Sequence, residues 1–174
     1  MLRFRVALVP LACAAALACS PALDWREFQP ESSGVVVAFP CKPDRHQRAV
    51  KLAGHSLDMR MLTCSAADLR FVLIHADVAA PAEVGAALAE LRTLAIGNLA
   101  GGEVDRQPLQ VPGMTPNDEA SRIRFTGRLP DGSVRQQQAA FFARGLRVYQ
   151  ASVVGERFEA ETVEPFFAAL RLPS

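Results

Sequence analysis

The spacing of apolar residues along the chain changes between two periods, and the change predicts strands separated by one clear helix. Residues 69–78 are apolar on both faces, which is typical of a strand covered on both sides. Between Pro81 and Leu99 the apolar positions recur every three or four residues and stop before Gly101-Gly102, so we expect a core-facing helix there. A second helix, or two short helical pieces around Pro165, is predicted over residues 156–170.

The remaining apolar runs are short, alternate with polar residues and are separated by turn residues. Ala53-Gly54-His55 and Pro130-Asp131-Gly132 are typical hairpin turns. The predicted strands are 33–39, 47–52, 56–64, 69–78, 103–111, 119–127, 133–143 and 146–154. This order predicts an α+β fold in which an antiparallel β-sheet has helices packed on it.

The start of the chain has the pattern of an export signal. Arg3 and Arg5 precede an apolar stretch over 6–17, and Ala16 and Ala18 are the small residues that a signal peptidase requires. The stretch is shorter than the roughly 20 apolar residues of a permanent membrane helix. We therefore predict a cleaved signal peptide over 1–18, a tether over 19–31 and a single domain over 32–174, exported to the periplasm.

Cys19 directly follows the predicted cleavage site, and two kinds of processing remain open. In a bacterial lipobox this cysteine is lipidated, which would anchor the protein to the outer membrane through its acyl chains alone. Here Leu17 lies two residues before the cysteine, whereas a lipobox usually has its leucine three residues before. Cleavage by a general signal peptidase would instead give a soluble periplasmic protein.

Charge excludes some classes of partner. The chain has 19 Lys and Arg residues and 18 Asp and Glu residues, and loss of Arg3 and Arg5 with the signal leaves 17 against 18. This balance gives no electrostatic attraction to nucleic acid or to an anionic membrane surface.

Cys41 and Cys64 form an even pair in an oxidising compartment, and both lie at the ends of predicted strands. We predict a disulfide between them, worth about 3 kcal/mol in the chain-entropy model. The alternative is a metal site made by Cys41, His46, His55 and Cys64, although structural zinc sites prefer closer ligand pairs.

Catalytic patterns are sparse. The sequence has no Gly-x-Ser-x-Gly nucleophile motif and no glycine-rich phosphate loop ahead of a helix. His75 and Asp77 are two residues apart on one predicted strand and share a face, so with a nearby serine they would suit a hydrolase.

A basic and amide-rich cluster lies on the predicted meander and is the candidate partner-binding surface. Adjacent strands would bring several of its members onto one polar face, with an exposed Tyr149 or Trp25 adding an aromatic contact. The cluster contains Arg122, Arg124, Arg135 and Gln136-Gln137-Gln138.

The order of elements resembles the small exported α/β sandwich domains of the PsbP, DcrB and Mog type, which include many bacterial envelope lipoproteins. The residues that carry the resemblance are Val36 to Pro43, Phe71 to Asp77, the helix before Gly101-Gly102, the strand from Glu119, Arg147-Val148-Tyr149-Gln150, and Phe166-Phe167 to Leu172. Cys41 departs from the glycine that such proteins often have. The resemblance implies an accessory or binding domain and carries over no ligand residue.

The leading hypothesis is a non-enzymatic accessory or binding module of the bacterial cell envelope that needs no cofactor. Its partner would be an envelope protein or a polysaccharide. A periplasmic hydrolase using His75 and Asp77 and a metal-binding protein using the cysteines and histidines are the alternatives.

Overall fold

The computed structural model describes residues 23–102 and 104–173, so the predicted signal peptide and Cys19 lie outside the described residues. Strands dominate this part of the chain, and two helices accompany them. In chain order the elements are β1 (Arg26–Phe28), β2 (Val37–Phe39), β3 (Asp44–Leu52), β4 (His55–Ala66), β5 (Leu69–Asp77), α1 (Glu83–Gly97), β6 (Val104–Pro108), β7 (Ser121–Arg128), β8 (Val134–Arg144), β9 (Arg147–Gly155) and α2 (Ala160–Ala168).

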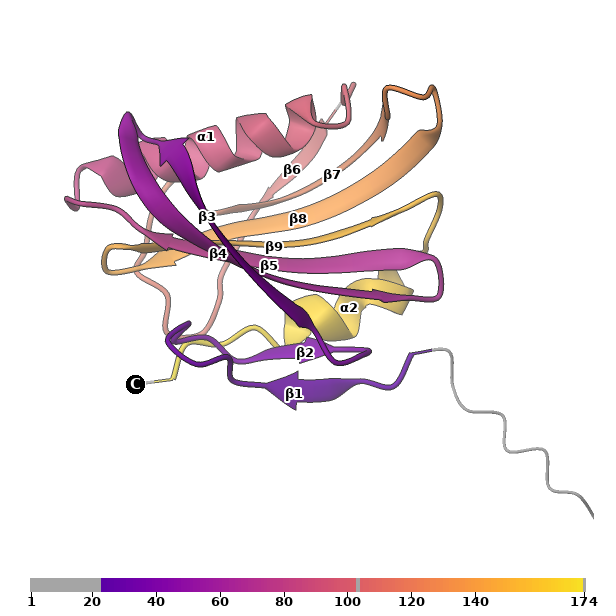
Figure 1. Ribbon diagram of the computed structural model, residues 1–174, viewed down its shortest axis with the longest axis horizontal. Coiled ribbons are helices and arrows are strands. Elements are labelled where there is room, and N and C mark those ends of the chain that lie inside the picture. The colour runs from indigo at the N-terminus through magenta and orange to yellow at the C-terminus, as the bar shows by residue number, and fades with distance from the viewer. Residues whose placement is uncertain (1–22, 103, 174) are drawn as a thin grey trace, which may run out of the picture.

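A seven-stranded antiparallel sheet forms the middle layer, in the order β3-β4-β5-β9-β8-β7-β6. Helix α1 covers one face, while α2 and the two-stranded β1–β2 ribbon cover the other (Figure 1). Consecutive hairpins build two halves of the sheet, and the β5–β9 pairing joins them. The predicted α+β fold, an antiparallel sheet with helices packed on it, is confirmed.

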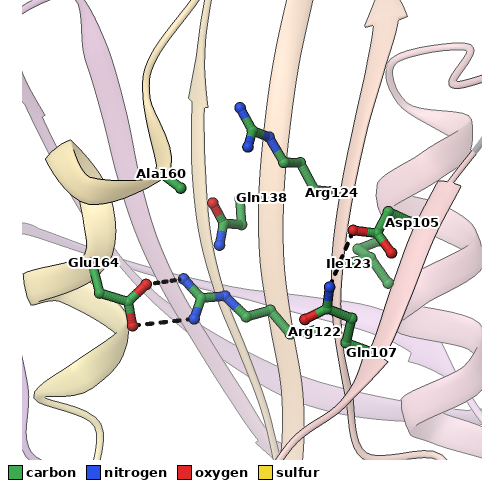
Figure 2. Close-up of a pocket in the computed structure, with 8 residues that line it drawn as sticks. All are labelled: Asp105, Gln107, Arg122, Ile123, Arg124, Gln138, Ala160 and Glu164. Carbon is green, nitrogen blue, oxygen red and sulfur yellow. Dashed lines mark hydrogen bonds and ion pairs between the residues drawn. The ribbon is translucent and has the colours of Figure 1, made fainter.

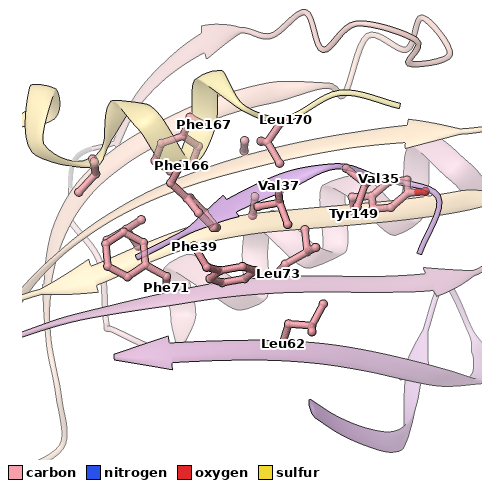
Figure 3. Close-up of a cluster of buried hydrophobic side chains, with 14 of the residues drawn as sticks. Val35, Val37, Phe39, Leu62, Phe71, Leu73, Tyr149, Phe166, Phe167 and Leu170 are labelled. Carbon is pink, nitrogen blue, oxygen red and sulfur yellow. The ribbon is translucent and has the colours of Figure 1, made fainter. Parts of the chain in front are cut away.

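The core between the sheet and the α2 layer is rich in aromatic rings (Figure 3). Phe166 of α2 meets Phe39 and Phe71 edge to face, with centroids 5.4 and 5.5 Å apart. This is the favoured geometry for aromatic pairs, and it adds to the free energy gained by burying the rings. The helix and the ribbon are thereby held to the same patch of the sheet.

Helix α1 packs its apolar stripe on the opposite face of the sheet, as its period predicts. The buried residues of the stripe include Val84, Leu88 and Leu91, and they share a core cluster with Phe125 and Phe141 of the sheet. In α2, Pro165 lies inside a single helix. Phe166 and Phe167 are buried beside this proline, and their packing offsets the backbone hydrogen bond that proline cannot donate.

Residues 23–31 differ from the predicted tether. Arg26–Phe28 pair with Val37–Phe39 as β1, and Trp25 packs edge to face on Phe71 at 5.4 Å between centroids. A three-residue strand is too short to show a period in the sequence, and the burial of Trp25 and its apolar neighbours is what fixes the segment.

The predicted disulfide between Cys41 and Cys64 is present, with Cα atoms 5.9 Å apart. Cys41 follows β2 and Cys64 lies in β4. The bond therefore joins the ribbon layer to the seven-stranded sheet, and it is compatible with an oxidising, exported location.

Candidate functional site

A polar groove lies beside α2, where the sheet extends beyond the helix toward its β6 edge (Figure 2). Its volume is about 220 Å³. Strands β6, β7 and β8 supply the floor, and α2 supplies one wall. The lining residues are Asp105, Gln107, Arg122, Ile123, Arg124, Gln138, Ala160 and Glu164.

Strand register explains why polar groups gather here. Arg124 has Asp105 and Gln138 as its cross-strand partners, and Arg122 has Gln107. Side chains of cross-strand partners point to the same face of a sheet, so residues from three strands form one polar floor. Helix α2 packs on the neighbouring strands and does not cover this patch, so the side chains of the patch can be polar.

Arg122 is held rigidly in the groove. Its guanidinium donates two hydrogen bonds to the carboxylate of Glu164, at 3.2 and 2.6 Å, and lies 4.3 Å above the centre of the Phe167 ring. With the amide of Gln138 turned so that its oxygen faces Arg122, Nε donates to that oxygen at 2.6 Å. A bidentate ion pair, a cation–π contact and an amide together fix the side chain.

Arg124 is the positively charged side chain of the groove that remains available to bind a ligand. It donates to the backbone oxygen of Phe158 at a long 3.4 Å, and it forms no ion pair with any of the described residues. Asp105, its cross-strand partner, instead accepts a hydrogen bond from Gln107 at 3.3 Å. The remaining N–H groups of Arg124 are therefore free to bind a ligand.

The structure splits the predicted basic cluster between the two faces of the sheet. Arg135 and Gln137 pair with Gly127 and Phe125, so they lie on the α1 face, opposite Arg122 and Arg124. Arg135 pairs there with Glu156 at 3.2 Å, and Gln137 is only 5% exposed. The prediction of one continuous face is wrong for these two residues, because successive side chains of a strand alternate between faces.

Tyr149 is also wrong as a surface residue. It is 1% exposed, and its ring stacks on Phe142 with centroids 4.9 Å apart. Trp25, the other aromatic candidate, is half-buried against Phe71. Asp105, Gln107 and Glu164 were not predicted; the spacing of Asp105 and Gln107 places them on one face of β6, but only the register of β6 against β7 brings that face to the arginines.

Among the described residues Asp77 is bound to Arg147, and no hydrogen bond joins it to His75. Both oxygens of Asp77 accept hydrogen bonds from Arg147, at 2.6 and 2.8 Å, and this contact holds the pKa of the carboxyl group below its usual value. Burial, together with the nearby charges of Arg147 and Arg60, lowers the pKa of His75 to about 4. No serine or cysteine among residues 23–102 and 104–173 makes a hydrogen bond to the imidazole, so the arrangement lacks a nucleophile next to its base.

The four predicted metal ligands do not come together either. Cys41 and Cys64 bind each other, His46 lies 3.4 Å from the hydroxyl of Thr63, and His55 contacts Glu83 of α1 at 3.2 Å. Within the described part of the chain, no cluster of histidine, cysteine or carboxylate side chains has the geometry of a metal site. The alternative of a metal site is excluded for these four residues, because Cys41 and Cys64 are bonded to each other.

In comparisons with known proteins, neither a family model nor a curated sequence matches this chain. Of the helices in the described residues, none has the length and apolar character needed to cross a membrane.

Proposed function

We propose that this protein is a non-enzymatic binding module of the bacterial cell envelope, and that the groove beside α2 binds an acidic polysaccharide. The observation that carries the proposal is the guanidinium of Arg124, which forms no ion pair with the described residues and is held next to a rigid Arg122 in a groove open to solvent. A guanidinium presents a planar set of donors that matches a carboxylate.

The other groups in the groove favour a sugar over a simple anion. Asp105, Gln107 and Glu164 bring acceptors close to the two arginines, so the groove offers donors and acceptors side by side. Sugar hydroxyl groups both donate and accept hydrogen bonds, and an acidic sugar adds the carboxylate that would pair with Arg124. A simple anion that has no hydroxyl groups would be repelled by the carboxylates of Asp105 and Glu164.

The envelope location rests on the predicted signal peptide and on the disulfide, which suits an oxidising compartment. We propose that the mature protein is periplasmic, with either a lipid on Cys19 or a free N-terminus. The resemblance of the sequence to exported domains of the PsbP, DcrB and Mog type favours the same class of function.

The test is titration of the disulfide-intact protein with tetragalacturonate, an acidic oligosaccharide, and with neutral cellotetraose. We expect saturable binding of the acidic sugar, at least tenfold weaker binding of the neutral one, and an at least tenfold loss in Arg124→Gln. Arg128→Gln is the matched control, since Arg128 lies further along β7 outside the groove.

Equal binding by Arg124→Gln and the parent protein would contradict the proposal. Binding of hexaglutamate in preference to the sugar would point to an acidic protein partner instead.

A further inference from the structure

A second cavity, of about 250 Å³, lies on the same face of the sheet but near the opposite edge, formed by β3, β4 and β5 with the segment before β2. It takes no part in the function proposed above. Its lining combines arginines, a buried histidine and an apolar wall. The lining residues are Pro30, Glu31, Ser32, Arg45, His46, Gln47, Arg60, Met61, Leu62 and His75.

His75 forms the inner end of this cavity. The residue is only 3% exposed, and its imidazole makes no hydrogen bond to any of the described residues. Among those residues, no fully enclosed side-chain nitrogen or oxygen lacks a partner, so the unpaired ring nitrogens must reach the cavity. The ring nitrogens are thus open to the cavity, where a ligand atom would replace solvent as their hydrogen-bond partner.

Positive charge surrounds the cavity. Arg60 is the cross-strand partner of both Gln47 and His75, and Arg45 lies on the same face two residues before Gln47. Neither Arg45 nor Arg60 forms an ion pair with a described residue. Of the lining side chains, Glu31 is the one carboxylate, so the charge of the two arginines exceeds it.

Two charged residues beyond the lining, Arg147 and Asp77, are close to His75. Arg147 and Asp77, which both influence His75, are bound to each other. Arg147 also donates to the backbone oxygen of Ser32, which fixes the segment that closes the cavity. The site is therefore preorganised before a ligand arrives, which reduces the entropy lost on binding.

One wall of the cavity is apolar. Leu62, the cross-strand partner of Arg45, is buried on this face of the sheet, and Pro30 is buried on the closing segment. Small-molecule sites typically combine such a wall with a few convergent polar groups. The volume admits a ligand about the size of one substituted ring.

We propose that this cavity binds a small organic anion whose carboxylate or phosphate group lies between Arg45 and Arg60, next to His75, and whose apolar part contacts Leu62 and Pro30. The neutral imidazole donates its one N–H to an anion oxygen. This is a site for a small molecule, distinct from the polysaccharide groove.

The experiment is an NMR titration of the disulfide-intact protein with benzoate, phenyl phosphate and neutral benzamide. We expect saturable shifts at residues 30–32, 45–47, 60–62 and 75 with one or both anions, and at least tenfold weaker binding of benzamide. The tighter of the two anions identifies the head group. Equal affinity for benzamide, or no saturable shift with either anion, would overturn the proposal.

Variants of the two cavity arginines test which positive charges bind the anion. Arg60→Gln and Arg45→Gln, both at exposed positions, are each expected to weaken anion binding at least tenfold. Arg48→Gln on β3 lies outside the cavity and is expected to change nothing. Unaltered binding in both cavity variants would refute the assignment. Arg124→Gln should bind benzoate normally, which separates this result from that of the groove.

Discussion

The hydroxyl group of Tyr149 donates a hydrogen bond to the backbone oxygen of Ser33 at 2.6 Å, across 116 residues of sequence. Ser33 is fully buried, and Tyr149 lies in the middle of the sheet on β9. The contact fastens the segment before β2 to the central strand. It also gives a buried carbonyl group the partner that it needs.

Tyr149→Phe is therefore expected to lower the free energy of unfolding by about 1–3 kcal/mol, because it leaves the Ser33 carbonyl buried and unpaired. The stack on Phe142 is retained in this variant. Urea unfolding followed by the fluorescence of Trp25, the single tryptophan, measures the effect. Thr63→Val, which removes an exposed hydroxyl contact to His46, is the control and should change stability little. Equal losses in both variants would contradict the prediction.

His75 makes stability depend on pH. Its pKa is lowered from the usual 6.5 to about 4 in the folded protein, so the unfolded chain takes up a proton first as the pH falls. The contribution is fully present above pH 6.5 and is lost between pH 6.5 and 4, as linkage requires. A shift of this size corresponds to at most about 3 kcal/mol, and contact with solvent in the cavity reduces it to about 1–2 kcal/mol.

The check on His75 is the difference in unfolding free energy between the parent protein and His75→Gln, measured by urea titration across this pH range. The carboxyl groups titrate in both proteins and therefore cancel from this difference. Because only the parent protein contains His75, the difference should move in favour of the variant as the pH falls. Parallel stability curves would show that His75 does not titrate as its burial implies.

The disulfide is expected to stabilise the fold mainly by restricting the unfolded chain. Cys41→Ser should lower the free energy of unfolding by about 3 kcal/mol, and Tm by about 6–12 °C, in oxidising buffer. In reductant the variant and the parent protein should melt together, as differential scanning calorimetry would show. A similar difference in both buffers would mean that packing of the Cys41 side chain is what was lost.

Gly127 is required where β7 passes the end of α1. A Cβ atom at this position would overlap the backbone oxygen of Leu99, which already accepts a hydrogen bond from Arg128 at 2.5 Å. Gly127→Ala should lower stability by about 2 kcal/mol or more. Gly97→Ala, in α1 with open space around it, should be neutral or stabilising by up to about 1 kcal/mol. Thermal unfolding of the two variants compares them directly; a tolerated Gly127→Ala would contradict the close approach.

Processing at Cys19 has its own test. If Cys19 is lipidated, Cys19→Ser should move the protein from the membrane fraction to the soluble periplasmic fraction of a Gram-negative host. Intact mass would show acyl chains on the parent protein alone. Unchanged fractionation would favour cleavage by a general signal peptidase.

Local periodicity was enough to predict most of the fold. The hairpin around Ala53-Gly54, the strand over 69–78, the helix over 81–99 and the meander are all present, because the burial or turn geometry of each leaves a local pattern of apolar or turn residues. The β1 strand was missed because three residues are too few to show an alternating pattern.

The site was predicted only in part, for the same physical reason. Arg122 and Arg124 do share a polar face, but Glu164 lies 42 residues from Arg122, and no local pattern connects them. Tyr149 lies between Val148 and Gln150 in the sequence, and its hydroxyl group contacts Ser33, 116 residues away. Arg135 and Gln137 show that residues should be assigned to a face of the sheet from the alternation of side chains along the strand. The clustering of similar residues in the sequence is a weaker guide.

The disulfide sets how this protein would respond to a mechanical load applied at its N-terminal end. Such a load first reaches β1, whose pairing with β2 covers three residues. Peeling can progress through the ribbon only as far as Cys41, where the covalent bond passes the tension into β4. Because β4 is paired along its length with β3 and β5, the load then becomes a shear over two long strand pairs. A protein pulled by an anchored N-terminus would thus lose its ribbon and keep its sheet.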